Sequence, residues 1–198
     1  MSVASEFENA NKAYASNFTK GDLALPPGRK VIVVACMDAR LDPARALGLE
    51  EGDAHVIRNA GGRTVEALRS VVISQQLLGT REIVIVHHVC EFLSCIFALI
   101  KLPEFCCSVR GYFKYSTKAN SSIEQTDCGM LTFSDTDVRS KIKEELNENA
   151  DHIAFLPFKD LKQSVIDDVE VLKKSPLVLD VPITGYVYDV KTGKIDKV

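Results

Sequence analysis

The sequence has no surplus of positive charge. Lys and Arg together number 24 against 27 Asp and Glu, which gives a formal net charge of -3. A chain with this balance has no bulk attraction for nucleic acid or for an anionic membrane surface. We therefore expect no nucleic acid and no membrane among its partners.

Long hydrophobic runs are also lacking. The most apolar stretch, residues 83–100, is interrupted by His87, His88 and Glu91, whereas a spanning helix needs roughly 20 apolar residues with few polar breaks. The opening residues MSVASEFENANKAYAS contain neither the basic region nor the apolar core of a secretory signal. We expect a cytoplasmic protein, in which the six cysteines are metal ligands, catalytic groups or buried thiols rather than disulfides.

Nucleotide-binding motifs are missing as well, because neither GxGxxG nor GxxxxGK occurs in the chain. The length of 198 residues and the apolar fraction of 46% are typical of one globular domain that buries its own core. The composition therefore predicts a single domain over residues 1–198, with no dinucleotide or triphosphate site.

Short β-branched runs alternate with helical patterns along most of the chain. Strands are expected at 30–36, 54–57 and 82–87, and helices at 5–18, 43–47, 64–78, 134–146 and 159–174. Residues 183–190 and 194–198 could form a hairpin or a terminal strand. This alternation predicts an α/β fold with a mostly parallel central sheet flanked by helices, preceded by an N-terminal helix and linker over 1–29.

The tract 89–125 differs in composition from the domain around it. It holds Cys90, Cys95, Cys106 and Cys107 and shows no sustained period, and loops above about 15 residues are uncommon inside compact domains. The tract begins with Val89, whose codon begins with GT, and ends with Gln125, which CAG can encode. These are the two ends of an unspliced intron that is translated in frame. A genuine functional insertion is the alternative.

The run from Cys36 to Arg40 (CMDAR) follows directly on the first buried strand. Ligands bind at this carboxyl edge in open α/β sheets. Cys36 offers a soft ligand, Asp38 a hard acceptor and Arg40 a fixed charge. A buried thiol beside a surface ion pair is the alternative interpretation.

His88 ends the third predicted strand, and parallel packing puts it at the same edge as Cys36. Cys128 opens the segment beyond the tract, and without the tract His88 and Cys128 would form an H-x-x-C motif. One histidine and two cysteines make a zinc ligand set with an open fourth position, as in catalytic sites. Taken singly, His88 could be a core histidine and Cys128 a free buried thiol.

Taken together, these residues resemble the β-class carbonic anhydrases, and the chain looks most similar to the short members of that family. The resemblance spans roughly residues 30–198 without the tract. It rests on CMDAR (36–40), HVIRNAGGR (55–63), RSVVISQQLLGTREIVIVHH (69–88) and TDCGMLTF (126–133).

The resemblance implies a zinc enzyme that interconverts carbon dioxide and bicarbonate. Zinc would be held by Cys36, His88 and Cys128. Asp38 would either occupy the fourth position or pair with Arg40 and leave that position to water.

The resemblance further implies that Asn59, Gly61 and Gly62 line the substrate pocket. His87 would not be a ligand, because alternation along the strand points it the other way. The family is homodimeric, and the N-terminal helix would reach across to the partner subunit. Two alternative functions are a catalytically impaired zinc-binding variant disrupted by the insertion, and a zinc hydrolase of carbon disulfide or carbonyl sulfide.

Overall fold

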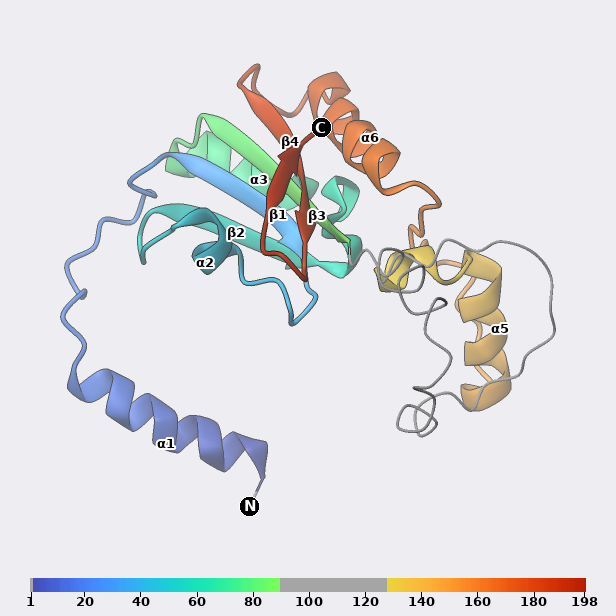
Figure 1. The fold of residues 1–198 in the computed structure, drawn as a ribbon, viewed down its shortest axis with the longest axis horizontal. Helices are drawn as coiled ribbons and strands as arrows, with labels where there is room; N and C mark the ends of the chain where they lie inside the picture. The colour runs from blue at the N-terminus through green and yellow to red at the C-terminus, as the bar shows by residue number, and fades with distance from the viewer. Residues whose placement is uncertain (1, 90–127) are drawn as a thin grey trace, which may run out of the picture.

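The computed structural model describes residues 2–89 and 128–198, which form a five-stranded sheet in the order β2-β1-β3-β4-β5 (Figure 1). The first four strands are parallel, and β5 pairs antiparallel with β4. The strands are β1 (Val31–Cys36), β2 (Ala54–Asn59), β3 (Glu82–Val89), β4 (Ile183–Asp189) and β5 (Ile195–Lys197). The helices are α1 (Val3–Ser16), α2 (Pro43–Leu47), α3 (Thr64–Leu78), α5 (Asp135–Leu146) and α6 (Leu161–Lys174), with 3-10 turns η1 (Ala60–Gly62) and η2 (Gly129–Leu131).

This arrangement confirms the predicted α/β fold with a mostly parallel sheet. Two strands run further than the apolar pattern indicated. β2 continues to Asn59 because Asn59 pairs with Cys36, and β3 continues to Val89, which pairs with Asp189. Both extensions carry polar site residues into the sheet, where pairing with a neighbouring strand outweighs their weak strand preference.

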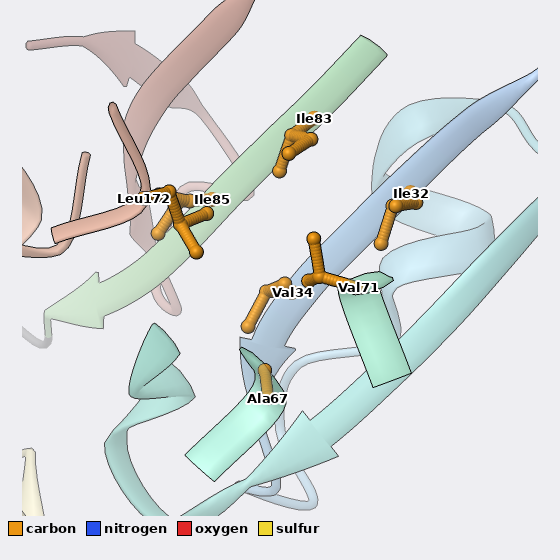
Figure 2. Close-up of a cluster of buried hydrophobic side chains, with 7 residues drawn as sticks. All are labelled: Ile32, Val34, Ala67, Val71, Ile83, Ile85 and Leu172. Atoms are coloured by element: carbon orange, nitrogen blue, oxygen red, sulfur yellow. The ribbon is translucent and has the colours of Figure 1, made fainter. Parts of the chain in front are cut away.

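The core lies on both faces of the sheet because successive residues of a strand point to opposite sides. On one face Ile32 and Val34 of β1 pack with α3 and α6, and on the other Val33 and Ala35 pack near α2. Figure 2 shows the first cluster, which consists of Ile32, Val34, Ala67, Val71, Ile83, Ile85 and Leu172. Each fully buried aliphatic side chain contributes about 1.5–3 kcal/mol, so this face holds α3 and α6 firmly against the strands.

Local signals set the ends of the helices. The Asp42 side chain accepts from the backbone N–H groups of Ala44 and Arg45 at the start of α2. Gly79 ends α3 in the left-handed region with φ 72°. Ser134 and Asp137 form a reciprocal capping box at the start of α5.

Two helices lie at the periphery. Neither α1 nor α5 contains a buried residue, and both stand apart from the sheet in Figure 1. Of the helices in the described ranges, none is both long and apolar enough to cross a membrane. Of the atypical tract, the structure describes Val89 alone, as the last residue of β3; residues 90–125 lie outside the described residues, so the origin of the tract stays a prediction.

Candidate metal centre

Two cysteines and a histidine converge at the carboxyl edge of the parallel strands. Cys36 is the last residue of β1, His88 lies near the end of the neighbouring β3, and Cys128 immediately precedes η2. Their exposed fractions are 5%, 1% and 1%. The Cys128 and His88 side chains lie near enough to Cys36 to lower the pKa of its thiol. The fold therefore brings together the residues on either side of the tract.

The Cys36 and Cys128 side chains shift each other's pKa in opposite directions. The hydrogen bond with Cys128, followed by that with His88, lowers the pKa of Cys36 to about 4 although burial opposes this. The hydrogen bond with Cys36, followed by burial, raises the pKa of Cys128. A metal that binds both sulfurs requires both as thiolates, because thiolate is the ligand form of cysteine.

Asp38 forms a two-pronged ion pair with Arg40. The Arg40 Nε atom donates to Oδ1 at 3.0 Å, and Nη2 donates to Oδ2 at 2.8 Å. These bonds lower the pKa of Asp38 to about 2, because they stabilise the carboxylate form. The Oδ2 atom also lies 3.5 Å from Nε2 of His88. Of the two arrangements considered for Asp38, the structure contains the pair with Arg40.

Arg58 of β2 is a site residue that the sequence analysis did not single out. Its Nε donates to the carbonyl of Cys36 at 3.1 Å and its Nη2 donates to the carbonyl of Asp38 at 2.7 Å. These bonds hold the backbone between the thiol and the carboxylate in place. The available signal was a lone arginine near the end of an apolar strand pattern, within the HVIRNAGGR motif.

The loop after β2 packs directly against the backbone of Cys36. Asn59 closes this loop, since its side chain accepts from the Arg63 N–H at 2.7 Å and donates to the Arg63 carbonyl at 2.8 Å. Gly61 and Gly62 have φ of 77° and 72°, and a Cβ on Gly62 would lie 3.0 Å from the Cys36 nitrogen. Glycine is required here by both the backbone conformation and the close approach.

His87 and His88 point to opposite faces of the sheet. His88 faces Asp38, whereas His87 Nδ1 lies 2.8 Å from Ser164 Oγ and His87 Nε2 lies 3.2 Å from Asp168 Oδ2. Ser164 and Asp168 both belong to α6. The expectation that His87 points away from the site residues agrees with these contacts.

The donor chemistry of the site fits zinc. Two thiol sulfurs and an imidazole are ligand types that zinc favours, and all three side chains are buried. Within residues 2–89 and 128–198 no three His, Cys, Asp or Glu side chains form a ready-made metal cluster. The residues present therefore match the metal by type, and binding would require the side chains to adjust.

Comparison with known proteins identifies close similarity over the whole chain. A family model described as carbonic anhydrase matches residues 31–195. The chain is 37% identical over 202 residues to beta-carbonic anhydrase 1 of Mycobacterium tuberculosis, with 100% of this chain and 99% of that protein covered. It is 28% identical to the carbon disulfide hydrolase of Acidianus sp., over 93% of this chain and 83% of that protein.

A solved structure shows the same similarity. The carbonic anhydrase of Streptococcus mutans superposes with a TM-score of 0.77 at 39% identity, covering 100% of this chain and 98% of that one. The likeness therefore extends over nearly the full length of both chains.

Proposed function

The chain belongs to the β-class carbonic anhydrase family, and on this premise we propose that Cys36, His88 and Cys128 hold a zinc ion with which the protein interconverts carbon dioxide and bicarbonate. The observation that carries the ligand assignment is the burial of all three side chains, with Cys36 and His88 at the carboxyl ends of β1 and β3 and Cys128 near enough to Cys36 to shift its pKa. Cys128 lies on the far side of the tract 89–125.

Zinc, when bound, lowers the pKa of a water molecule toward about 7 and so supplies a nucleophile for carbon dioxide near neutral pH. Asp38 stays ionised beside Arg40 and can accept a hydrogen bond from a hydroxyl that enters the site. Since the Asp38 oxygens are engaged by Arg40, we favour this role over direct ligation of the metal by Asp38.

The loop of Asn59, Gly61 and Gly62 is proposed to line the substrate pocket. Its support is the approach of Gly62 to the backbone of Cys36 and the fixing of Asn59 by Arg63. A Cβ on Gly62 would meet the backbone of Ala35 and Cys36, and a Cβ on Gly61 would meet Met130 and Phe158, so glycine at both positions lets the loop pack closely beside the proposed site.

Zinc analysis combined with stopped-flow carbon dioxide hydration tests the proposal. The full chain should bind one zinc and hydrate carbon dioxide, and Cys36→Ser and Cys128→Ser should lose both properties. The matched control is Cys95→Ser, a cysteine of the tract that is not a proposed ligand, which should retain both. Full zinc retention in either ligand variant contradicts the assignment.

Hydrolysis of carbon disulfide or carbonyl sulfide is a second candidate, favoured by the 28% identity with a carbon disulfide hydrolase. Release of hydrogen sulfide from carbon disulfide by the zinc-loaded chain, together with slow carbon dioxide hydration, would support it. A third candidate is a zinc-binding form of low activity, in which the tract 89–125 impairs the site.

We further propose that the protein is a homodimer and acts in the cytoplasm. Exposed apolar side chains along α1, Val3, Phe7 and Tyr14, support a partner surface of the same chain. The free thiols of Cys36 and Cys128 support a reducing compartment. Sedimentation velocity of the full chain tests the dimer, and fractionation of the source cells tests the compartment.

A further inference from the structure

The position of Cys128 depends on contacts made by the residues that follow it, because the tract 89–125 separates it from His88. These following residues include η2 and α5, and α5 contributes no buried residue. In Figure 1 α5 stands apart from the sheet. Within the described residues, the chain between Cys128 and α6 packs on the η1 loop through η2 and Phe158, and the Leu156 carbonyl accepts a bond from Arg63.

Phe158 holds the turn that begins at Cys128. Its backbone N–H donates to the carbonyl of Met130 at 3.2 Å, and Met130 is 6% exposed. A Cβ on Gly61 would lie 3.0 Å from Met130 Cγ and 3.3 Å from Phe158 Cε1. Met130 and Phe158 therefore both pack on the η1 loop, which runs under the metal site.

The Phe158 ring packs against two side chains that belong to the sheet side of the site. It stacks on the His87 ring with centroids 5.6 Å apart and planes at 17°, and the Arg63 guanidinium carbon lies 5.6 Å from its centroid. Arg63 Nη1 also donates to the carbonyl of Leu156 at 3.2 Å. Arg63 therefore binds the chain on both sides of Pro157.

Both partners of the ring are anchored on one fully buried carboxylate. Asp168 Oδ2 lies 2.9 Å from Arg63 Nε and 3.2 Å from His87 Nε2, and Asp168 is 0% exposed. Ser164 Oγ lies 2.8 Å from His87 Nδ1. The surface that receives Phe158 is thus fixed by β3, α6 and the end of the η1 loop.

We propose that Phe158, packed on Arg63 and His87, is a positioning residue that delivers Cys128 to the metal site independently of the chain connection through 89–127. The inference rests on the proposed zinc site. It assigns His87 a role that does not involve the metal directly. His87 stacks on Phe158 and so helps to position Cys128, while His88 is itself a proposed ligand.

Zinc K-edge X-ray absorption tests this proposal, because it counts sulfur neighbours at about 2.3 Å. The full chain should show two sulfurs. Phe158→Leu, which removes the ring, should show fewer than two and bind zinc roughly 10–100-fold more weakly, as is typical when a residue supporting a ligand is lost. Phe158→Tyr keeps the ring and should restore both values.

Val71→Ala is the control for lost stability, since Val71 lies in the core cluster with Ile32 and Val34, which contains none of the residues of this mechanism. It should lower the thermal midpoint and leave the sulfur count at two. Two sulfurs and unchanged affinity in Phe158→Leu would overturn the positioning role. Fewer than two sulfurs in the unmodified chain would instead overturn the proposed zinc site.

A second measurement does not depend on the metal. In the protein before zinc loading, Cys128 is 1% exposed and should resist alkylation, as mapped by mass spectrometry of its peptide. Phe158→Leu should make Cys128 react at least tenfold faster, and Val71→Ala should not. Equal protection of Cys128 in Phe158→Leu and in the unmodified chain would also overturn the proposal.

Discussion

At the scale of single residues, the Asp38 carboxylate and the Arg40 guanidinium form one functional group. Their paired bonds of 3.0 and 2.8 Å fix the carboxylate orientation and keep its pKa at about 2. The backbone N–H of Arg40 also donates to Oδ1 of Asp38 at 2.8 Å, so Arg40 orients the carboxylate with both its backbone and its side chain.

We predict that Asp38→Ala and Arg40→Ala each reduce carbon dioxide hydration by roughly 10²-fold, the scale of a lost proton-handling group. The double variant should be little worse than either single variant, because the second change removes a group that has already lost its partner. Stopped-flow assays measure the three rates, and circular dichroism checks the fold. Losses that simply sum would show two independent residues.

The buried Asp168 carboxylate supports stability rather than chemistry. We predict that Asp168→Asn lowers the free energy of unfolding at pH 7 by about 3–5 kcal/mol, because it leaves the Arg63 charge without its buried partner. Denaturant unfolding measures the change. Asp167→Asn is the matched control on the same helix, since Asp167 is exposed, and it should change stability by less than about 0.5 kcal/mol.

The stabilities of wild type and of Asp168→Asn should also depend differently on pH. Burial alone would raise the pKa of Asp168, but the His87 hydrogen bond and the Arg63 charge lower it below its usual 3.8. A depressed folded-state pKa gives stability that is present above about pH 4 and is lost as the pH falls. The difference in free energy of unfolding between wild type and Asp168→Asn should therefore become smaller below pH 4. A difference that stays constant with pH would contradict the lowered pKa of Asp168.

At the scale of elements, the η1 turn sets the floor of the site. It links the end of β2 to α3 and passes so close to Cys36 that Gly62 has no room for a side chain. The conformation is also left-handed, with φ 72°. The close approach to Cys36 and the left-handed conformation therefore both require glycine at position 62.

We predict that Gly62→Ala lowers both stability and zinc affinity. The control is Gly79→Ala, because Gly79 has the same φ of 72° and a Cβ there meets nothing within 4 Å. Both variants should lose about 1 kcal/mol of stability through backbone strain. Only Gly62→Ala should also lose zinc affinity, measured by chelator competition, since its new methyl group pushes on Cys36. Equal zinc affinity in the two variants would rule out that contact.

At the scale of the whole molecule, the tract 89–125 separates His88 from Cys128 along the chain. Closing a loop of this length costs only about 3 kcal/mol by the logarithmic rule, and in the described part of the chain both Cys36 and Cys128 are buried. The expected damage is local, because Cys128 no longer follows His88 through a short turn.

We predict that deletion of residues 89–125 raises both zinc affinity and carbon dioxide turnover, since it restores the H-x-x-C spacing of His88 and Cys128. Chelator competition and stopped-flow assays on the full and shortened chains measure the two effects. Equal affinity and turnover would show that the tract is harmless. Sequencing of the transcripts tests its origin, and a dominant spliced form that retains the tract would exclude the intron.

The apolar periodicity was sufficient to predict the α/β fold and the main helices, because core burial depends on local patterns that a short window contains. Gly79 at the end of α3 and Ser134 at the start of α5 were readable for the same reason. The likeness to the family identified Cys36, Asp38, Arg40, His88 and Cys128 as a set.

The tertiary structure alone determined how these residues are held. Arg58 binds two backbone carbonyls from a neighbouring strand, and Phe158 packs on Arg63 and His87 from far along the chain. No periodicity or motif encodes such contacts, because they depend on the distance between side chains after the strands and α6 have packed. The sequence thus determined which chemical groups are available, and the packing determined which of them meet.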